Sequence, residues 1–151
     1  MLKPSGEMVH ASAVLVGEHA VLIRGGAGSG KSRLAWALLE AARAGTIAYA
    51  RLVADDRVRV FAAGGRLLAA TPDKTAGMIE VRGLGIRRLA HEPLAQIGLV
   101  VDLGVKDGAR MPEALASETE FLGIKLPRLP VADGEEALAL VIARFSSAAA
   151  A

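Results

Sequence analysis

The chain has 151 residues, of which 52% are hydrophobic and 23% charged, a balance typical of a globular domain rather than of a disordered segment. It contains no cysteine, which excludes disulfides and thiolate metal sites and fits a reducing compartment. Its formal charge of +2 is uneven: residues 1–90 hold thirteen Lys and Arg against seven Asp and Glu (+6), and residues 91–151 hold five against nine (−4). The basic excess fits either a bound polyphosphate or a set of solvated surface arginines.

The same properties indicate where the protein works and what it does not bind. No apolar run approaches the roughly 18–20 residues of a membrane span, and the first residues lack the apolar stretch of a signal peptide. The basic residues form no dense run interleaved with aromatic residues, a pattern that favours nucleic-acid binding where it occurs. We therefore expect a cytoplasmic protein with neither a membrane nor a nucleic acid as partner.

The hydrophobic pattern predicts one α/β domain over residues 1–147, followed by an Ala-rich tail at 148–151. Gly64-Gly65 between two apolar runs predicts a hairpin. Gly45 is expected to end the first helix, and Asp133 and Glu136 are expected to cap the last one. In chain order, the expected strands are 9–16, 20–23, 47–54, 58–62, 66–70, 78–81 and 97–103, and the expected helices are 32–43, 112–120 and 135–145.

A phosphate-binding loop of the form G-x-x-x-x-G-K-[ST] follows the second expected strand and opens the first expected helix. Its glycines let the backbone wrap closely around phosphates, and the helix N-terminus adds positive potential there. On this solvent-facing loop, Lys31 is predicted to bridge the β- and γ-phosphates of ATP and the Ser32 hydroxyl to bind Mg²⁺. The loop consists of Gly25, Gly26, Ala27, Gly28, Ser29, Gly30, Lys31 and Ser32.

A phosphate loop needs an acidic partner, and two candidates end expected strands. The first is the pair Asp55-Asp56, which can divide the work, one carboxylate ordering Mg²⁺ or its water and the other taking a proton. The second is Asp102, although a single Asp before Leu103-Gly104 is also ordinary turn chemistry.

These residues resemble the catalytic domain of HPr kinase/phosphorylase. The resemblance is carried by Leu52-Val53-Ala54-Asp55-Asp56 after the phosphate loop and by the stretch Glu80-Val81-Arg82-Gly83-Leu84-Gly85-Ile86. It extends over residues 7–145. The family phosphorylates a seryl hydroxyl of HPr, the phosphocarrier protein of the bacterial sugar phosphotransferase system. The resemblance implies a P-loop kinase-like domain with a mixed β-sheet flanked by helices, in a short form that consists of the catalytic domain alone.

The resemblance also implies roles for single residues. Asp56, or else Asp55, matches the catalytic carboxylate that acts as base in phosphorylation and as acid in the reverse reaction. His10 matches an active-site histidine, Glu80 a metal-associated glutamate, and Arg82 a segment implicated in catalysis. Family members form hexamers, so a homo-oligomer is expected.

The chain departs from the family at residues 130–136, where many members carry arginines. Asp133, Glu135 and Glu136 stand there instead. We therefore expect a Mg²⁺- and ATP-dependent protein-serine kinase acting on HPr, with weak phosphorolysis of its product. The alternatives are a small-molecule P-loop kinase and a non-catalytic ATP-sensing regulatory module.

Overall fold

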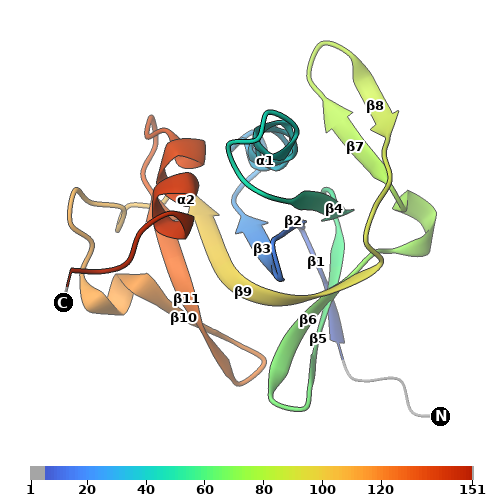
Figure 1. Ribbon diagram of the computed structural model, residues 1–151. Coiled ribbons are helices and arrows are strands. Elements are labelled where there is room, and N and C mark those ends of the chain that lie inside the picture. Colours follow the sequence, from blue (N-terminus) through green and yellow to red (C-terminus); the bar gives the residue numbers. More distant parts are fainter. Residues whose placement is uncertain (1–5, 151) are drawn as a thin grey trace.

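The protein folds as two α-helices and a strongly curved, mixed β-sheet, seen in a computed structural model that describes residues 6–150 (Figure 1). Residues 1–5 and 151, the ends of the expected domain and tail, lie outside the described residues. In chain order the elements are β1 (Gly6–Val9), β2 (Ala11–Val16), β3 (His19–Arg24), α1 (Lys31–Arg43), β4 (Ala50–Ala54), β5 (Val58–Ala63), β6 (Arg66–Ala70), β7 (Met78–Val81), β8 (Gly85–Arg88), β9 (Leu94–Leu103), β10 (Glu118–Phe121), β11 (Ile124–Val131) and α2 (Ala137–Phe145), with 3₁₀ turns at Asp73–Thr75 and Ala114–Ser117.

Four strands of the main sheet end at the same edge. The strand order is β1-β5-β6-β9-β3-β2-β4, and β11 pairs with β9 while β10 pairs with β11. β9 runs parallel to β3, and β11 runs parallel to β9. β4 has the same direction as β3, because both are antiparallel to β2. The carboxyl ends of β3, β4, β9 and β11 therefore meet at one edge, the place where α/β sheets bind their ligands.

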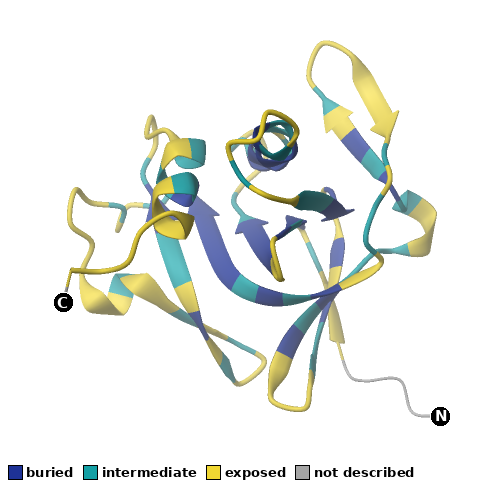
Figure 2. Cartoon of the chain, viewed as in Figure 1, coloured by how far each residue is buried: buried dark blue, intermediate teal, exposed yellow. Residues whose placement is uncertain are grey.

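The two faces of the main sheet are buried in different ways. Both helices pack on one face, where Leu38 of α1 and Val141 of α2 join a core with Ile23 and Val101. On the other face the sheet curls over itself, and no helix within residues 6–150 contributes to that second core. Figure 2 shows β3 and β9 buried along most of their length, while the hairpin of β7 and β8 is largely exposed.

The expected α/β fold with a mixed sheet is confirmed, with both helices on a single face. The helix that follows the phosphate loop is confirmed, and Gly45 follows its last turn with a φ of 79°. The hairpin of β5 and β6 is confirmed with Gly64-Gly65 as its turn. The expected strand 9–16 is interrupted at His10, which lies at a bend between β1 and β2.

Two expectations for the second half of the chain were wrong. The expected helix 112–120 is a short 3₁₀ turn followed by β10, because pairing with β11 outweighs local helix propensity. The residues between β10 and β11, Leu122 and Gly123, both have positive φ, as a two-residue hairpin turn requires. α2 begins at Ala137, so the residue at its N-cap is Glu136, without a side-chain capping bond, and Asp133 lies too far upstream to cap it.

None of the helices within residues 6–150 is long and apolar enough to cross a membrane.

Candidate functional site

The phosphate loop connects the end of β3 to the first residue of α1. Gly25 packs closely against the loop, because a Cβ atom there would lie 2.3 Å from Ser29 Oγ and 3.0 Å from Ser29 Cβ. Gly30, directly before α1, has a φ of 100°, which only glycine adopts without strain. Ser29 Oγ is buried and makes no hydrogen bond within the described residues. An unpaired hydroxyl beside a helix N-terminus fits a phosphate group as its partner.

Lys31 is buried. The sequence had predicted a solvent-facing position for it on the loop, so this expectation was wrong. Its Nζ donates hydrogen bonds to the carbonyl oxygens of Gly25 and Gly26, at 2.8 and 3.0 Å. The first residue of α1 thus holds the start of the loop through its own side chain. The ammonium group therefore lies inside the curve of the loop, where it can neutralise bound phosphates.

Asp55 directly follows β4 and is buried beside the loop. Its carboxylate accepts hydrogen bonds from Ser32 Oγ at 2.8 and 2.9 Å and from Ser12 Oγ at 2.6 Å. The main-chain N–H of Glu80 donates a further bond at 3.1 Å. Since the Ser32 hydroxyl gives its proton to Asp55, its lone pairs remain free to bind a cation.

Asp56 differs from Asp55 in almost every respect. Its side chain is 67% exposed, and its Oδ1 atom is hydrogen-bonded to His10 Nε2 at 2.7 Å. Its backbone has a φ of 68°, which turns the residue out of the strand direction. The main-chain N–H of Asp56 also points to Ser12 Oγ at 3.4 Å. The pair therefore consists of one carboxylate turned inward to the phosphate loop and one turned outward to solvent.

The structure brings Glu80 to the site but leaves Arg82 outside it. Glu80 lies in β7 with its N–H bound to Asp55 and its side chain exposed. Arg82 lies in the turn between β7 and β8, and within residues 6–150 no hydrogen bond or ion pair joins it to the loop or to Asp55 and Asp56. No group of three or more His, Asp and Glu side chains in this part of the chain forms a ready-made metal site.

Asp102, the second acidic candidate, forms a separate ion-pair network. It is buried at the end of β9 and receives hydrogen bonds from Arg24 at 2.7 and 2.8 Å and from Arg128 at 2.5 Å. Arg128 also binds Asp107. Burial by itself raises the pKa of Asp102, but the hydrogen bonds from the two arginines outweigh it and hold this pKa below its ordinary value. Both carboxylate oxygens of Asp102 are thus bonded to arginines.

Ser12 is the site residue that the sequence analysis missed. Its side chain is completely buried in β2, yet it bonds both to the Asp55 carboxylate and to the N–H of Asp56. A single hydroxyl two residues after His10 in an otherwise apolar strand was the available signal. Pairing between Ala13 of β2 and Ala54 of β4, which brings Ser12 to Asp55, is not visible in the sequence.

Comparisons with known proteins agree on a single family. Residues 4–149 match the family described as HPr Serine kinase C-terminal domain. The chain is 36% identical over 147 residues to the HPr kinase/phosphorylase of Geobacillus thermodenitrificans, a match that covers 89% of this chain and 45% of that relative. It is 34% identical over 119 residues to the corresponding protein of Brevibacillus brevis, which covers 74% and 36%. The chain thus spans less than half the length of these curated relatives.

A solved structure has the same fold. The Hpr(Ser) kinase/phosphatase from Coxiella burnetii superposes with a TM-score of 0.73, over 93% of this chain and 88% of that one. The two sequences are 22% identical, so this likeness concerns the fold.

Proposed function

Since the chain belongs to the family of the HPr Serine kinase C-terminal domain, we propose that it is an ATP-dependent protein-serine kinase that acts on HPr. The observation that carries the proposal is the arrangement at the sheet edge, where the inward Asp55 joins Ser32 of a complete phosphate loop and the outward Asp56 faces solvent beside it. Such an arrangement separates a metal-ordering carboxylate from a proton-accepting one.

The loop and Asp55 would hold ATP and Mg²⁺. Lys31, Ser29 and the N-terminus of α1 supply positive or donating groups for the phosphates. Ser32 would bind the metal directly, with Asp55 fixing the direction of its hydroxyl, and Glu80 is proposed to assist from β7. ATP supplies the phosphoryl group and Mg²⁺ neutralises its charge.

Asp56 is proposed to take the proton of the acceptor. An exposed carboxylate beside the loop can reach a seryl hydroxyl that another protein presents. His10 holds Oδ1 of Asp56, which fixes the carboxylate and leaves Oδ2 for the hydroxyl. Arg82, on its hairpin turn, is proposed to act only in the complex with the acceptor protein.

Further parts of the proposal rest on the family. We propose a cytoplasmic location, a domain that ends near Ser147, and a hexameric or other homo-oligomeric state. The decisive experiment follows transfer of labelled phosphate from ATP to purified HPr and measures ATP binding in parallel. Transfer to the serine of HPr supports the proposal. ATP binding without transfer would instead indicate a sensing module, and transfer to a small molecule alone would indicate a small-molecule kinase.

Replacing Ser12 by alanine is expected to lower the rate of transfer about tenfold and to destabilise the fold by about 1–2 kcal/mol, because Asp55 loses a charge-assisted hydrogen bond. The transfer rate and the free energy of unfolding are measured together. Thr71→Val is the control, since it removes a partly buried hydroxyl that bonds to the Val53 carbonyl of β4 and, within residues 6–150, makes no hydrogen bond to Asp55. That variant should lose stability and keep its transfer rate. Equal rates for Ser12→Ala and wild type would remove Ser12 from the site.

The reverse reaction is expected to be weak or absent. Attack of inorganic phosphate on phosphoserine brings two anions together, so positive groups must offset their repulsion. Asp133 lies beside the end of β9, where a Cβ atom at Gly104 would be 3.0 Å from its Oδ1. Arg128, which could otherwise replace the family's arginines, is bound to Asp102 and Asp107. The acidic residues of this segment would therefore oppose an incoming phosphate.

The measurement incubates serine-phosphorylated HPr with phosphate and Mg²⁺ and follows pyrophosphate release. Forward transfer under the same conditions is the control. Pyrophosphate release as fast as the forward reaction would contradict the expectation.

A further inference from the structure

We propose that Met8, Arg57 and Arg59 form the surface that binds the acceptor protein, and that this surface selects a seryl hydroxyl flanked by an apolar side chain and by carboxylates. The inference rests on the proposed function, because it names the part of the same site that recognises the acceptor.

A hollow opens directly beside the proposed base. It has a volume of about 420 Å³ and is lined by Met8, His10, Asp56 and Arg57. A general base must lie within about 2.6–3.2 Å of the proton that it removes. The acceptor hydroxyl therefore has to enter this hollow, and the residues next to it in the acceptor must contact the walls.

Met8, one of the lining residues, lies on β1, which pairs with β5. Met8 lies opposite Arg59 in this antiparallel pair, so the two side chains stand on the same face. Both are exposed, with Val58 and Val60 buried on either side of Arg59. Side chains alternate along a strand, which directs Glu7 away from the face that carries Met8.

The chemistry of this surface, formed by Met8, Arg57 and Arg59, indicates the chemistry of its partner. Met8 is 53% exposed, and an exposed thioether side chain is an adaptable apolar surface for a partner. Arg57 and Arg59 are exposed, and within residues 6–150 neither forms an ion pair. Two arginines without acidic partners attract carboxylates on an approaching protein. An acceptor with an apolar residue and acidic residues around its serine complements this surface.

The test measures transfer to purified HPr while HPr and ATP are varied in turn. Arg57→Glu and Arg59→Glu should each raise the KM for HPr about tenfold, with kcat and the KM for ATP changed less than about twofold. Met8→Ala should raise the KM for HPr about threefold, and Arg57→Lys should behave like wild type. Increasing salt should raise the KM of wild type more than that of Arg57→Glu, because screening weakens the same attraction.

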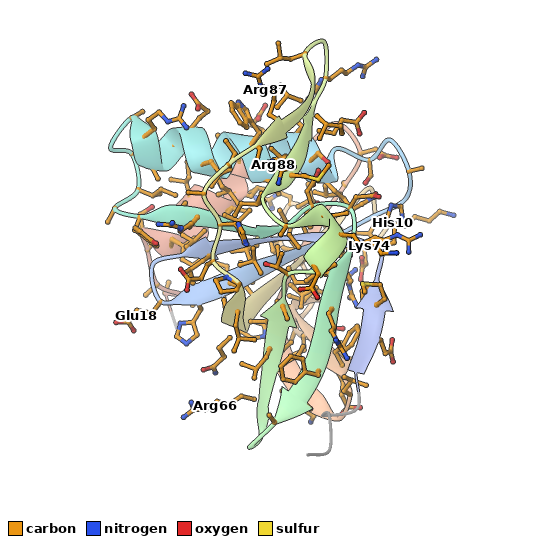
Figure 3. All side chains as sticks on the ribbon, turned by 90° about the vertical axis from the view of Figure 1, so that its right-hand side faces the viewer. His10, Glu18, Arg66, Lys74, Arg87 and Arg88 are labelled. Carbon is orange, nitrogen blue, oxygen red and sulfur yellow. The ribbon has the colours of Figure 1, made fainter. Side chains whose placement is uncertain are left out.

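Arg66→Glu is the matched control, because it makes the same change of charge at the far end of the face that Figure 3 shows, well away from His10. It should leave the KM for HPr unchanged. A tenfold increase of the KM for HPr in this control would show that the effect comes from overall charge, and it would overturn the inference. An unchanged KM for HPr in Arg57→Glu, or a rise in the KM for ATP instead, would do the same. If wild type binds ATP and transfers nothing to HPr, the proposed function fails and this inference fails with it.

Discussion

Replacing Asp56 by asparagine should lower the rate of transfer to HPr by about 10²–10⁴-fold and leave ATP binding nearly unchanged, the usual effect of removing a general base. The physical reason is the outward position of Asp56, whose side chain is bonded to His10 and, within residues 6–150, makes no hydrogen bond to the phosphate loop. Asparagine tolerates the left-handed backbone conformation seen at this residue, so the variant should fold normally. Single-turnover transfer and equilibrium ATP binding are the two measurements.

Asp102→Asn is the control for Asp56→Asn, because it removes a different carboxylate at the same edge of the sheet. It should cost about 3 kcal/mol of unfolding free energy, because Arg24 and Arg128 lose their buried partner. The contribution of Asp102 is present above the ordinary carboxyl pKa and is lost as pH falls through its lowered folded-state pKa. Transfer should fall far less than in Asp56→Asn. A severe loss of transfer at Asp102 with tolerance at Asp56 would reverse the assignment of the base.

Replacing Lys31 by alanine should abolish transfer, a loss of at least about 10²–10³-fold, because the ammonium group neutralises the phosphates as charge develops on them. The fold should lose only about 1 kcal/mol, since the two carbonyls that Lys31 holds belong to a surface loop. The initial rate of phosphorylation of HPr measures the first effect and thermal unfolding the second.

Arg33→Ala is the matched control for Lys31. Arg33 is an exposed cation in the same first turn of α1. Its removal should change transfer less than about threefold, because an exposed and solvated charge contributes little. Near-normal activity in Lys31→Ala would mean that this loop is not the site of catalysis.

The phosphate loop and the pair Asp55-Asp56 could be predicted because their signals are local. The loop requires glycine at fixed spacings before a lysine, and these residues are adjacent in the chain. The different surroundings of Asp55 and Asp56 could not be predicted, since they depend on Ser12 and Glu80, which reach them through sheet pairing and packing.

The features that sequence reasoning missed carry a weak or contrary signal in their own residues. β11 contains Pro127 and Pro130, which argue against a strand, yet it pairs with β9 and β10. β8 lies exposed and pairs only with β7 within residues 6–150, so its pattern carries no core signal. The buried position of Lys31 depends on loop carbonyls that curve back toward it, a shape that a sequence motif does not describe.

The long strand β9 also determines when the protein can assemble during its synthesis. Its residues 94–96 pair with β6, while its second half pairs with β3 and β11. Leu22 of β3 meets Val100, so the strand that leads into the phosphate loop waits for a segment made much later on the ribosome. Pairing over such separations is slow. Until Leu103 has left the ribosome, one edge of β3 stays open, and an open edge of an apolar strand is where nascent chains aggregate or are held by chaperones.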